Sequence, residues 1–342
     1  MNLSIVDLAP VPDGGTATDA YENTVEFAQM ADRLGYSRFW VAEHHAMAES
    51  VASTTPEVLL GHLTAKTTDI RLGSGTILLN HYQPFKVAET FATLDALAPG
   101  RIDLGLGRAT GVPAADHALG TERRQRNPDE RHAEKIDETV NHLFDGFDDD
   151  HHYSELSLPR AVDTVPEMWV LSSSPSSAKI AGELGLRYCF AAFIRPMFAE
   201  RAFETYREHF TQSPHGAGPD EPQGMLAVNA VCAETDHDAA RLRASAEATY
   251  QRMQRGVVGK TPGVEMAIEE LGGVPAPTPD PLPEDSWPRA ISGSPDTIRS
   301  LLEQLTARVG VDDVVIQNII ADHDDVLRSH ELLADAVGLT PR

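Results

Sequence analysis

The sequence predicts an α/β protein folded as a (β/α)8 TIM barrel with insertion segments. Eight short apolar runs alternate with segments of helical periodicity, the pattern of a parallel sheet whose strands are joined by helices. The length of 342 residues suits one such barrel, and an apolar content of 41% is ample for its core. We therefore expect a single domain over residues 1–342.

The strands are expected, in chain order, at Leu3–Leu8, Arg38–Ala42, Ile70–Thr76, Ile102–Leu106, Met168–Leu171, Tyr188–Phe193, Met225–Ala233 and Val314–Ile319. Helices are expected from a cap at Thr18 through Leu34, and at Pro56–Thr67, Lys86–Leu97, Asp129–Leu143, Ser176–Leu184, Pro196–Phe210, Asp236–Arg255, Pro295–Val309 and Asp324–Val337.

Two segments interrupt this alternation. Residues 145–165 are acidic and punctuated by proline, and we interpret them as an insertion. Residues 256–289 are rich in glycine and proline and lack a clear period, which predicts a mobile lid loop over the ligand.

The charge of the chain excludes several classes of partner. Lys and Arg number 28 against 52 Asp and Glu, giving a net charge of −24 spread along the whole length. Such a surface repels nucleic acid and anionic lipid, and we attribute it to adaptation to high salt, as in a halophilic organism. An anionic cofactor would need a local positive site.

The chain lacks the signals of export. No apolar run approaches the ~20 residues that cross a bilayer, and the N-terminus has no basic region typical of a signal peptide. Cys189 and Cys232 lie in apolar runs without metal-site spacing, which favours buried, reduced thiols. We expect a cytoplasmic protein without a metal site.

Arg108 follows the fourth expected strand, where a parallel α/β fold places its ligand. A guanidinium suits a phosphate or a carboxylate, although an ordinary surface arginine is the simpler interpretation of this stretch alone. The next loop carries Ser172–Ser177 at a helix start, where hydroxyls and free N–H groups can bind an anion or merely cap the helix. Because the two loops are neighbours, Arg108 and this cluster, which includes Ser173, Ser174 and Ser177, could hold one phosphate from two sides.

Glu43, His44 and His45 follow the second expected strand. Glu43 and His44 are a candidate acid/base pair, because histidine titrates near neutrality and a carboxylate can orient it. A buried structural pair is the alternative. Metal binding by the two histidines is disfavoured, because adjacent side chains on an extended segment point in opposite directions.

The third expected strand ends in small residues, Gly73 to Thr76. The absence of bulky side chains around Ser74 and Gly75 allows a flat ring to approach the backbone, although a tight barrel corner would explain the same pattern.

Taken together, these stretches resemble the bacterial luciferase-like flavin monooxygenase family, and within it the luciferase-like oxidoreductase subgroup. The segments that carry the resemblance are Leu3–Val11, Leu34–His45, Ala52–Leu60, Ile70–Leu79, Pro99–Gly111, Ser172–Ala181 and Ser292–Ile298.

The resemblance implies a barrel that binds FMN, often as a homodimer formed through its early helices. It implies that Glu43 and His44 are the active-site residues, with the histidine as acid/base. It places Ser74–Gly75 under the isoalloxazine, often joined by a non-proline cis peptide. The residues matching the phosphate site are Arg108, Ser174 and Ser177.

The chemistry implied is the use of reduced FMN, supplied by a transient partner, a flavin reductase, and of O2 to oxidise a small organic substrate. Two departures concern the pocket. Gly107 stands where the luciferase α-subunit has a reactive cysteine, and Phe190–Pro196 lacks a histidine common in the subgroup.

Two other functions remain compatible with these residues. A deazaflavin-dependent oxidoreductase shares the barrel and transfers a hydride without O2, and a salt-loving source would favour it. A non-catalytic flavin-binding protein is the other, although the presence of both Glu43 and His44 argues against it.

Overall fold

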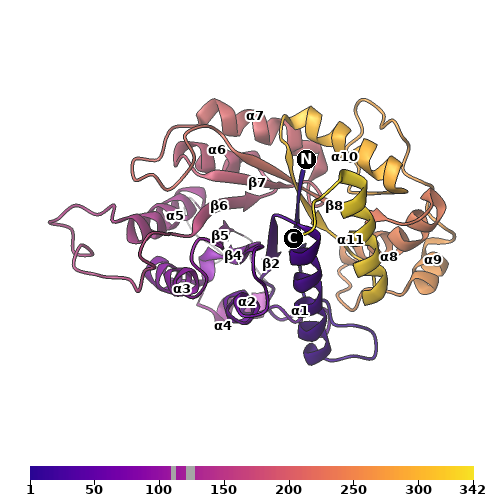
Figure 1. The fold of residues 1–342 in the computed structure, drawn as a ribbon, viewed down its shortest axis with the longest axis horizontal. Helices are drawn as coiled ribbons and strands as arrows, with labels where there is room; N and C mark the ends of the chain where they lie inside the picture. The colour runs from indigo at the N-terminus through magenta and orange to yellow at the C-terminus, as the bar shows by residue number, and fades with distance from the viewer. Residues whose placement is uncertain (109–112, 121–127) are drawn as a thin grey trace.

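The computed structural model describes residues 1–342 except 109–112 and 121–127. Within the described residues, eight parallel strands form a closed ring, which confirms the predicted barrel (Figure 1). In ring order these strands are β1 (Asn2–Asp7), β2 (Arg38–Val41), β3 (Arg71–Ser74), β5 (Ile102–Gly107), β6 (Glu167–Ser172), β7 (Arg187–Ala191), β8 (Gly224–Cys232) and β10 (Asp313–Gln317).

The predicted helices also form, and they surround the ring (Figure 1). Their bounds are α1 (Ala17–Leu34), α2 (Pro56–Thr64), α3 (Pro84–Leu97), α5 (Pro128–Phe144), α6 (Pro175–Glu183), α7 (Ala199–His209), α8 (Asp236–Gln254), α10 (Pro295–Val309) and α11 (His323–Val337). A single apolar core fills the space between helices and strands, with Phe39, Leu72 and Leu104 fully buried.

The cap of α1 differs from the expected one. Thr16, not Thr18, precedes the helix, and it forms a reciprocal capping box with Asp19. Both threonines can accept from a helix N–H, and the carboxylate three residues after Thr16 decides between them. Gly35 ends the helix in the left-handed conformation.

Several short elements were not predicted. These are β4 (Ile77–Leu78), the 3-10 turns η1 (Leu79–His81) and η2 (Pro196–Phe198), α4 (Pro113–Ala118), α9 (Val264–Leu271) and β9 (Ala290–Gly293). Most are shorter than two helical turns, too short to show a period in the sequence.

The expectation of an irregular segment at 256–289 was therefore wrong in part. Helix α9 packs Ala267, Ile268 and Leu271 against Ala244 and Ala248 of α8 on the outside of the barrel. Alanines on both sides allow this close approach, and the surrounding glycines and prolines hid it from the sequence. Residues 145–165 have no helix or strand and extend away from the barrel beside α3 and α5 (Figure 1).

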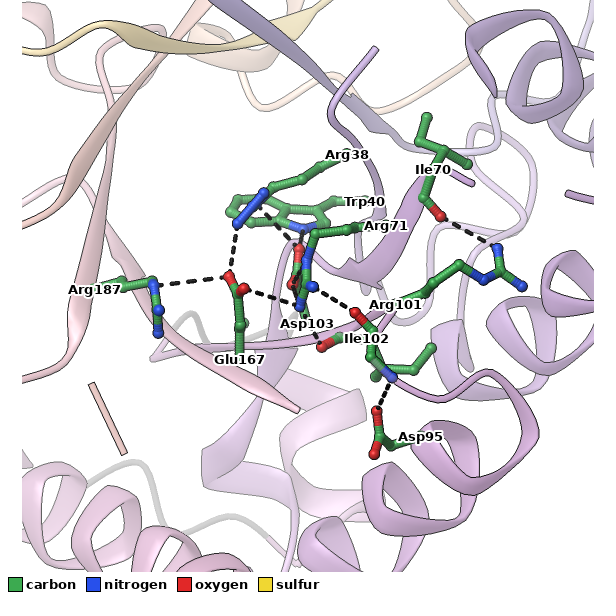
Figure 2. Close-up of polar contacts among 12 residues, drawn as sticks. Arg38, Trp40, Ile70, Arg71, Asp95, Arg101, Ile102, Asp103, Glu167 and Arg187 are labelled. Atoms are coloured by element: carbon green, nitrogen blue, oxygen red, sulfur yellow. Dashed lines mark hydrogen bonds and ion pairs between the residues drawn. The ribbon is translucent and has the colours of Figure 1, made fainter. Parts of the chain in front are cut away.

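The amino-terminal end of the barrel is closed by an ion-pair cluster (Figure 2). Asp103, which is fully buried, accepts hydrogen bonds from Trp40 Nε1 at 2.9 Å and Arg71 Nε at 2.8 Å, and Arg38 Nε lies 3.3 Å away. Glu167 accepts from Arg38 Nη2 at 2.6 Å.

The charged members of the cluster are the first or second residues of their strands: Arg38 of β2, Arg71 of β3, Asp103 of β5 and Glu167 of β6. The cluster therefore lies at the end of the barrel opposite the carboxyl ends of the strands. Burial alone would raise the pKa of Glu167, but Arg38, Arg71 and Arg187 hold it below its usual value. Trp40 links this floor to the cavity above, which its side chain lines. Among the described helices, none is both long and apolar enough to cross a bilayer.

Candidate active site

A cavity of about 580 Å³ opens at the carboxyl ends of the barrel strands. This is the face where barrels bind their ligands, and the volume is within the usual range for a small-molecule site. The cavity brings together loops that are distant in the sequence. The sequence-predicted residues that line it are Glu43, His44, Gly75, Arg108, Ser173, Ser174 and Ser177.

Ser74 is the exception among the predicted site residues. It is fully buried, and its hydroxyl donates to the carbonyl of Gly105 at 2.9 Å and accepts from the Gly105 N–H at 3.0 Å. The hydroxyl thus joins β3 to β5, and the neighbours Gly75 and Thr76 line the cavity instead.

Glu43 is held by three donors. Its carboxylate accepts from His45 Nε2 at 2.5 Å, from Tyr82 Oη at 2.8 Å and from the Leu78 N–H at 2.8 Å. Burial raises the pKa of Glu43, and the three hydrogen bonds act in the opposite direction. We expected Glu43 to pair with His44, but the histidine bonded to its carboxylate is His45. Side chains alternate along an extended segment, so residues 43 and 45 lie on the same side.

His44 lines the cavity with one ring nitrogen unused. Nδ1 is buried and has no hydrogen-bond partner among the described residues. Burial, and to a lesser extent the charge of His45, lowers the pKa of His44. The imidazole is neutral at pH 7 and can accept a proton.

Residues that the sequence did not single out extend the network from Glu43. The rings of His45 and His81 meet edge to face, with centroids 5.3 Å apart. His81 Nε2 lies 3.9 Å from a carboxylate oxygen of Asp116, a buried residue of α4. Tyr82 and His81 follow β4, and no periodic signal in the sequence marked them.

The floor of the cavity is a shelf of backbone beside Trp40. The peptide bond between Gly75 and Thr76 is cis, one bond further along than the one expected between Ser74 and Gly75. A Cβ at Gly75 would stand 3.1 Å from both Trp40 Cβ and Val6 Cγ2, tighter than an ordinary van der Waals contact, so glycine suits the close approach of the backbone to Trp40 here.

The same packing explains the glycine at 107. A Cβ built there would overlap the hydroxyl and the methyl group of Thr76. A cysteine at this position is incompatible with Thr76 in its present place.

Ser174 is the N-cap residue of α6, yet its hydroxyl does not accept from the helix. It lies 3.3 Å from Ser177 Oγ and 3.2 Å from Ser176 Oγ, so these hydroxyls gather above the first turn. An uncapped helix start with clustered hydroxyls is suited to an anion.

Arg108 lines the same cavity and pairs with Asp129 near the start of α5. The sequence did not predict this partner, which partly neutralises the cation. Burial lowers the pKa of Arg108 but leaves it charged. Burial and then Arg108 lower the pKa of His132 to about 4, so this neighbour adds no positive charge at pH 7.

The residues present fit a flavin: hydroxyls, an uncapped helix start and an arginine for a phosphate, and the backbone of Gly75–Thr76 for a flat ring. A model of the family described as luciferase-like monooxygenase matches residues 1–313. The chain belongs to the luciferase-like monooxygenase family. This membership, together with relatives that are named monooxygenases, supports an oxidoreductase of the flavin-dependent monooxygenase type.

The relatives of this luciferase-like protein match it nearly end to end. It is 36% identical to the N-acetyl-S-alkylcysteine monooxygenase of Bacillus subtilis, over 98% of each chain. It is 33% identical to a luciferase-like monooxygenase of Escherichia coli, over 97% of this chain and 96% of the other. The crystal structure of apo-MsnO8 is 40% identical, superposes with a TM-score of 0.87, and is covered to 99%, with all of this chain matched.

More distant structures share the fold alone. The oxygenating constituent of 3,6-diketocamphane monooxygenase from Pseudomonas putida, in complex with FMN, is 20% identical with a TM-score of 0.72. The coenzyme F420-dependent tetrahydromethanopterin reductase of Methanopyrus kandleri is 18% identical with a TM-score of 0.68. Each match covers at least 99% of both chains. The same fold thus occurs in one protein in complex with FMN and in another that depends on coenzyme F420.

Proposed function

We propose that this protein is a monooxygenase that uses reduced FMN and O2 to oxidise a small organic substrate. The observation that carries the proposal is one cavity lined at once by Arg108, Ser174 and Ser177 and by the neutral imidazole of His44. An anion-binding end and a proton-accepting group in one enclosure are what a phosphorylated redox cofactor and its substrate require.

Arg108 and the hydroxyls of Ser174 and Ser177 would hold the FMN phosphate. Their loops follow β5 and β6, which are neighbours in the ring, so both lie on one side of the mouth. Ser173, on the same loop, also lines the cavity. The charge of −24 makes this local cation necessary, because the global field opposes a dianion.

Gly75 and Thr76 would lie under the isoalloxazine ring. When bound, reduced FMN supplies the electrons with which O2 is activated for transfer of an oxygen atom to the substrate. His44 lines the cavity as a neutral base and would hold or return the proton that this transfer requires. Glu43 also lines the cavity and holds His45 and Tyr82 in place through hydrogen bonds.

The electrons would come from a separate flavin reductase that binds transiently, and the protein would act as a homodimer. Turnover that requires an added reductase and NADH tests the first statement, and light scattering of the purified protein tests the second. N-acetyl-S-alkylcysteines, which the name of the Bacillus relative specifies, are a first substrate class to assay.

A deazaflavin-dependent oxidoreductase is the second candidate, favoured by the shared barrel of the coenzyme F420-dependent reductase. Titration of the purified protein with FMN, riboflavin and coenzyme F420, followed by fluorescence, separates the two. Binding of FMN above riboflavin, with O2-dependent turnover, supports the proposal. Binding of coenzyme F420 without FMN contradicts it.

A further inference from the structure

The loop after β7 places a second arginine at the cavity mouth. Arg195 lines the cavity and is exposed, and no described residue forms a hydrogen bond or ion pair with its guanidinium. Of the two arginines that line the cavity, Arg108 pairs with Asp129, whereas Arg195 has no carboxylate partner among the described residues. A guanidinium left without a carboxylate partner is available to an anionic ligand.

The backbone carrying Arg195 is fixed. The N–H groups of Ile194 and Arg195 donate to the carbonyl of Ala191 at the end of β7, at 3.1 and 3.4 Å. The carbonyl of Arg195 in turn accepts from the Phe198 N–H at 3.1 Å, closing η2. The backbone at Arg195 is thus anchored to the end of β7, and its side chain, which lines the cavity, starts from that fixed point.

Arg195 stands across the mouth from the catalytic candidates. In the closed ring β2 and β7 are four strands apart in either direction, so the loop of Glu43 and His44 faces the loop of Arg195. Apolar side chains line the space between, including Leu8, Met47, Phe193, Ile194 and Val315. A ligand that spans this space has an apolar body, one end at His44 and the other at Arg195.

We propose that Arg195 is a specificity-determining residue that binds the carboxylate of the substrate, and that the substrate is an organic acid with an apolar body. The reading of the ligand as substrate rests on the proposed function. The contact itself is a charge-assisted hydrogen bond, which selects an acid over its neutral analogue.

Octanoate and octanamide are suitable probes, because they share size and apolar body but differ in charge. Calorimetry on the wild-type protein, with and without FMN, should show octanoate binding about tenfold more tightly than octanamide. Arg195→Gln should weaken the binding of octanoate by a similar factor and leave the binding of octanamide unchanged. Arg195→Lys should restore part of the preference for octanoate. Arg201→Gln is the matched control, because this exposed arginine of α7 pairs with Glu204 and its loss changes the net charge equally.

Three results would overturn the inference. The first is equal affinity of the wild type for the two probes, and the second is an equal effect of the Arg195 and Arg201 variants. The third is a fall in the preference for FMN over riboflavin on Arg195→Gln with octanoate unaffected, since that would assign Arg195 to the cofactor phosphate. A wild type that binds no flavin contradicts the proposed function instead, and the comparison of octanoate with octanamide still decides the role of Arg195.

Discussion

Glu43 accepts a hydrogen bond from His45 Nε2 at 2.5 Å, and not from His44, the histidine next to it in the chain. The two imidazoles therefore have separate tasks. His45 hydrogen-bonds to the buried Glu43, which also holds Tyr82, whereas His44 lines the cavity with Nδ1 unpartnered among the described residues.

Glu43→Gln is expected to weaken this network. A glutamine carbonyl cannot replace two carboxylate oxygens for the three donors, and a buried donor left without a partner costs ~1–3 kcal/mol. Thermal unfolding should shift downward, and turnover should fall while FMN remains bound. Tyr82→Phe, which removes one of the donors, should show a smaller loss of turnover. A Glu43→Gln variant with unchanged turnover and stability would refute the positioning role.

His44→Ala is expected to abolish turnover and to keep flavin binding. A non-catalytic flavin-binding protein would lose nothing measurable, so the variant separates the two functions.

The pH dependence of the wild type tests the same residue. Because burial lowers the pKa of His44 below its usual 6.5, the imidazole is already neutral at pH 7. In the wild type, kcat/KM should fall only as the pH drops below 6.5, because the base then becomes protonated. A limb centred above pH 6.5 would contradict the assignment of His44 as the base.

Arg108→Gln should lower the affinity for FMN by about ten- to a hundredfold, the usual range for a charge-assisted phosphate contact, and leave riboflavin unaffected. Asp129→Asn should act in the opposite direction, because it removes the carboxylate that competes with the phosphate for the guanidinium. Fluorescence titration with both flavins measures each ratio. Equal losses for FMN and riboflavin in Arg108→Gln would show a structural role only.

Gly107→Ala should displace Thr76 and disturb the shelf at the cavity floor. We expect weaker binding of both FMN and riboflavin, since the ring and not the phosphate is affected. Gly61→Ala in α2 is the control, because a Cβ there meets only Leu94 Cδ2 at an ordinary 3.7 Å. Unchanged flavin affinity in Gly107→Ala would show that the flavin ring does not lie on the Gly75–Thr76 backbone.

Asp103→Asn should destabilise the fold, because it removes the buried charge that compensates the half-buried guanidinium groups of Arg38 and Arg71. Breaking a buried pair typically costs ~3–5 kcal/mol, a large part of a domain's stability. Urea unfolding measures the loss. Arg328→Gln, which removes exposed pairs with Glu234 and Glu331, should cost far less. Equal losses of unfolding free energy in the two variants would contradict a stabilising role of the ion-pair cluster around Asp103.

The sequence predicted the barrel because each strand is a buried apolar run, and such runs do not depend on distant contacts to be seen. It also predicted the polar loops, since position after a strand decides which face they reach. The sequence did not predict which residues pair with one another within the site. Asp129 reaches Arg108 and Tyr82 reaches Glu43 only after folding. Helix α9, among glycines and prolines, likewise depends on packing against α8.

Other predictions stay open to experiment. The lid role of residues 256–289 is one, since none of them lines the cavity among the described residues. Hydrogen exchange of this segment with and without FMN measures it. The part of the Pro99–Gly111 segment that follows residue 108 lies outside the described residues.

The most direct measurement is a crystal structure of the FMN complex. We expect the phosphate within about 3 Å of the Arg108 guanidinium and of the Ser174 and Ser177 hydroxyls, with the ring over Gly75–Thr76. A phosphate bound elsewhere, with Arg108 still held by Asp129 and the serines unoccupied, would contradict it.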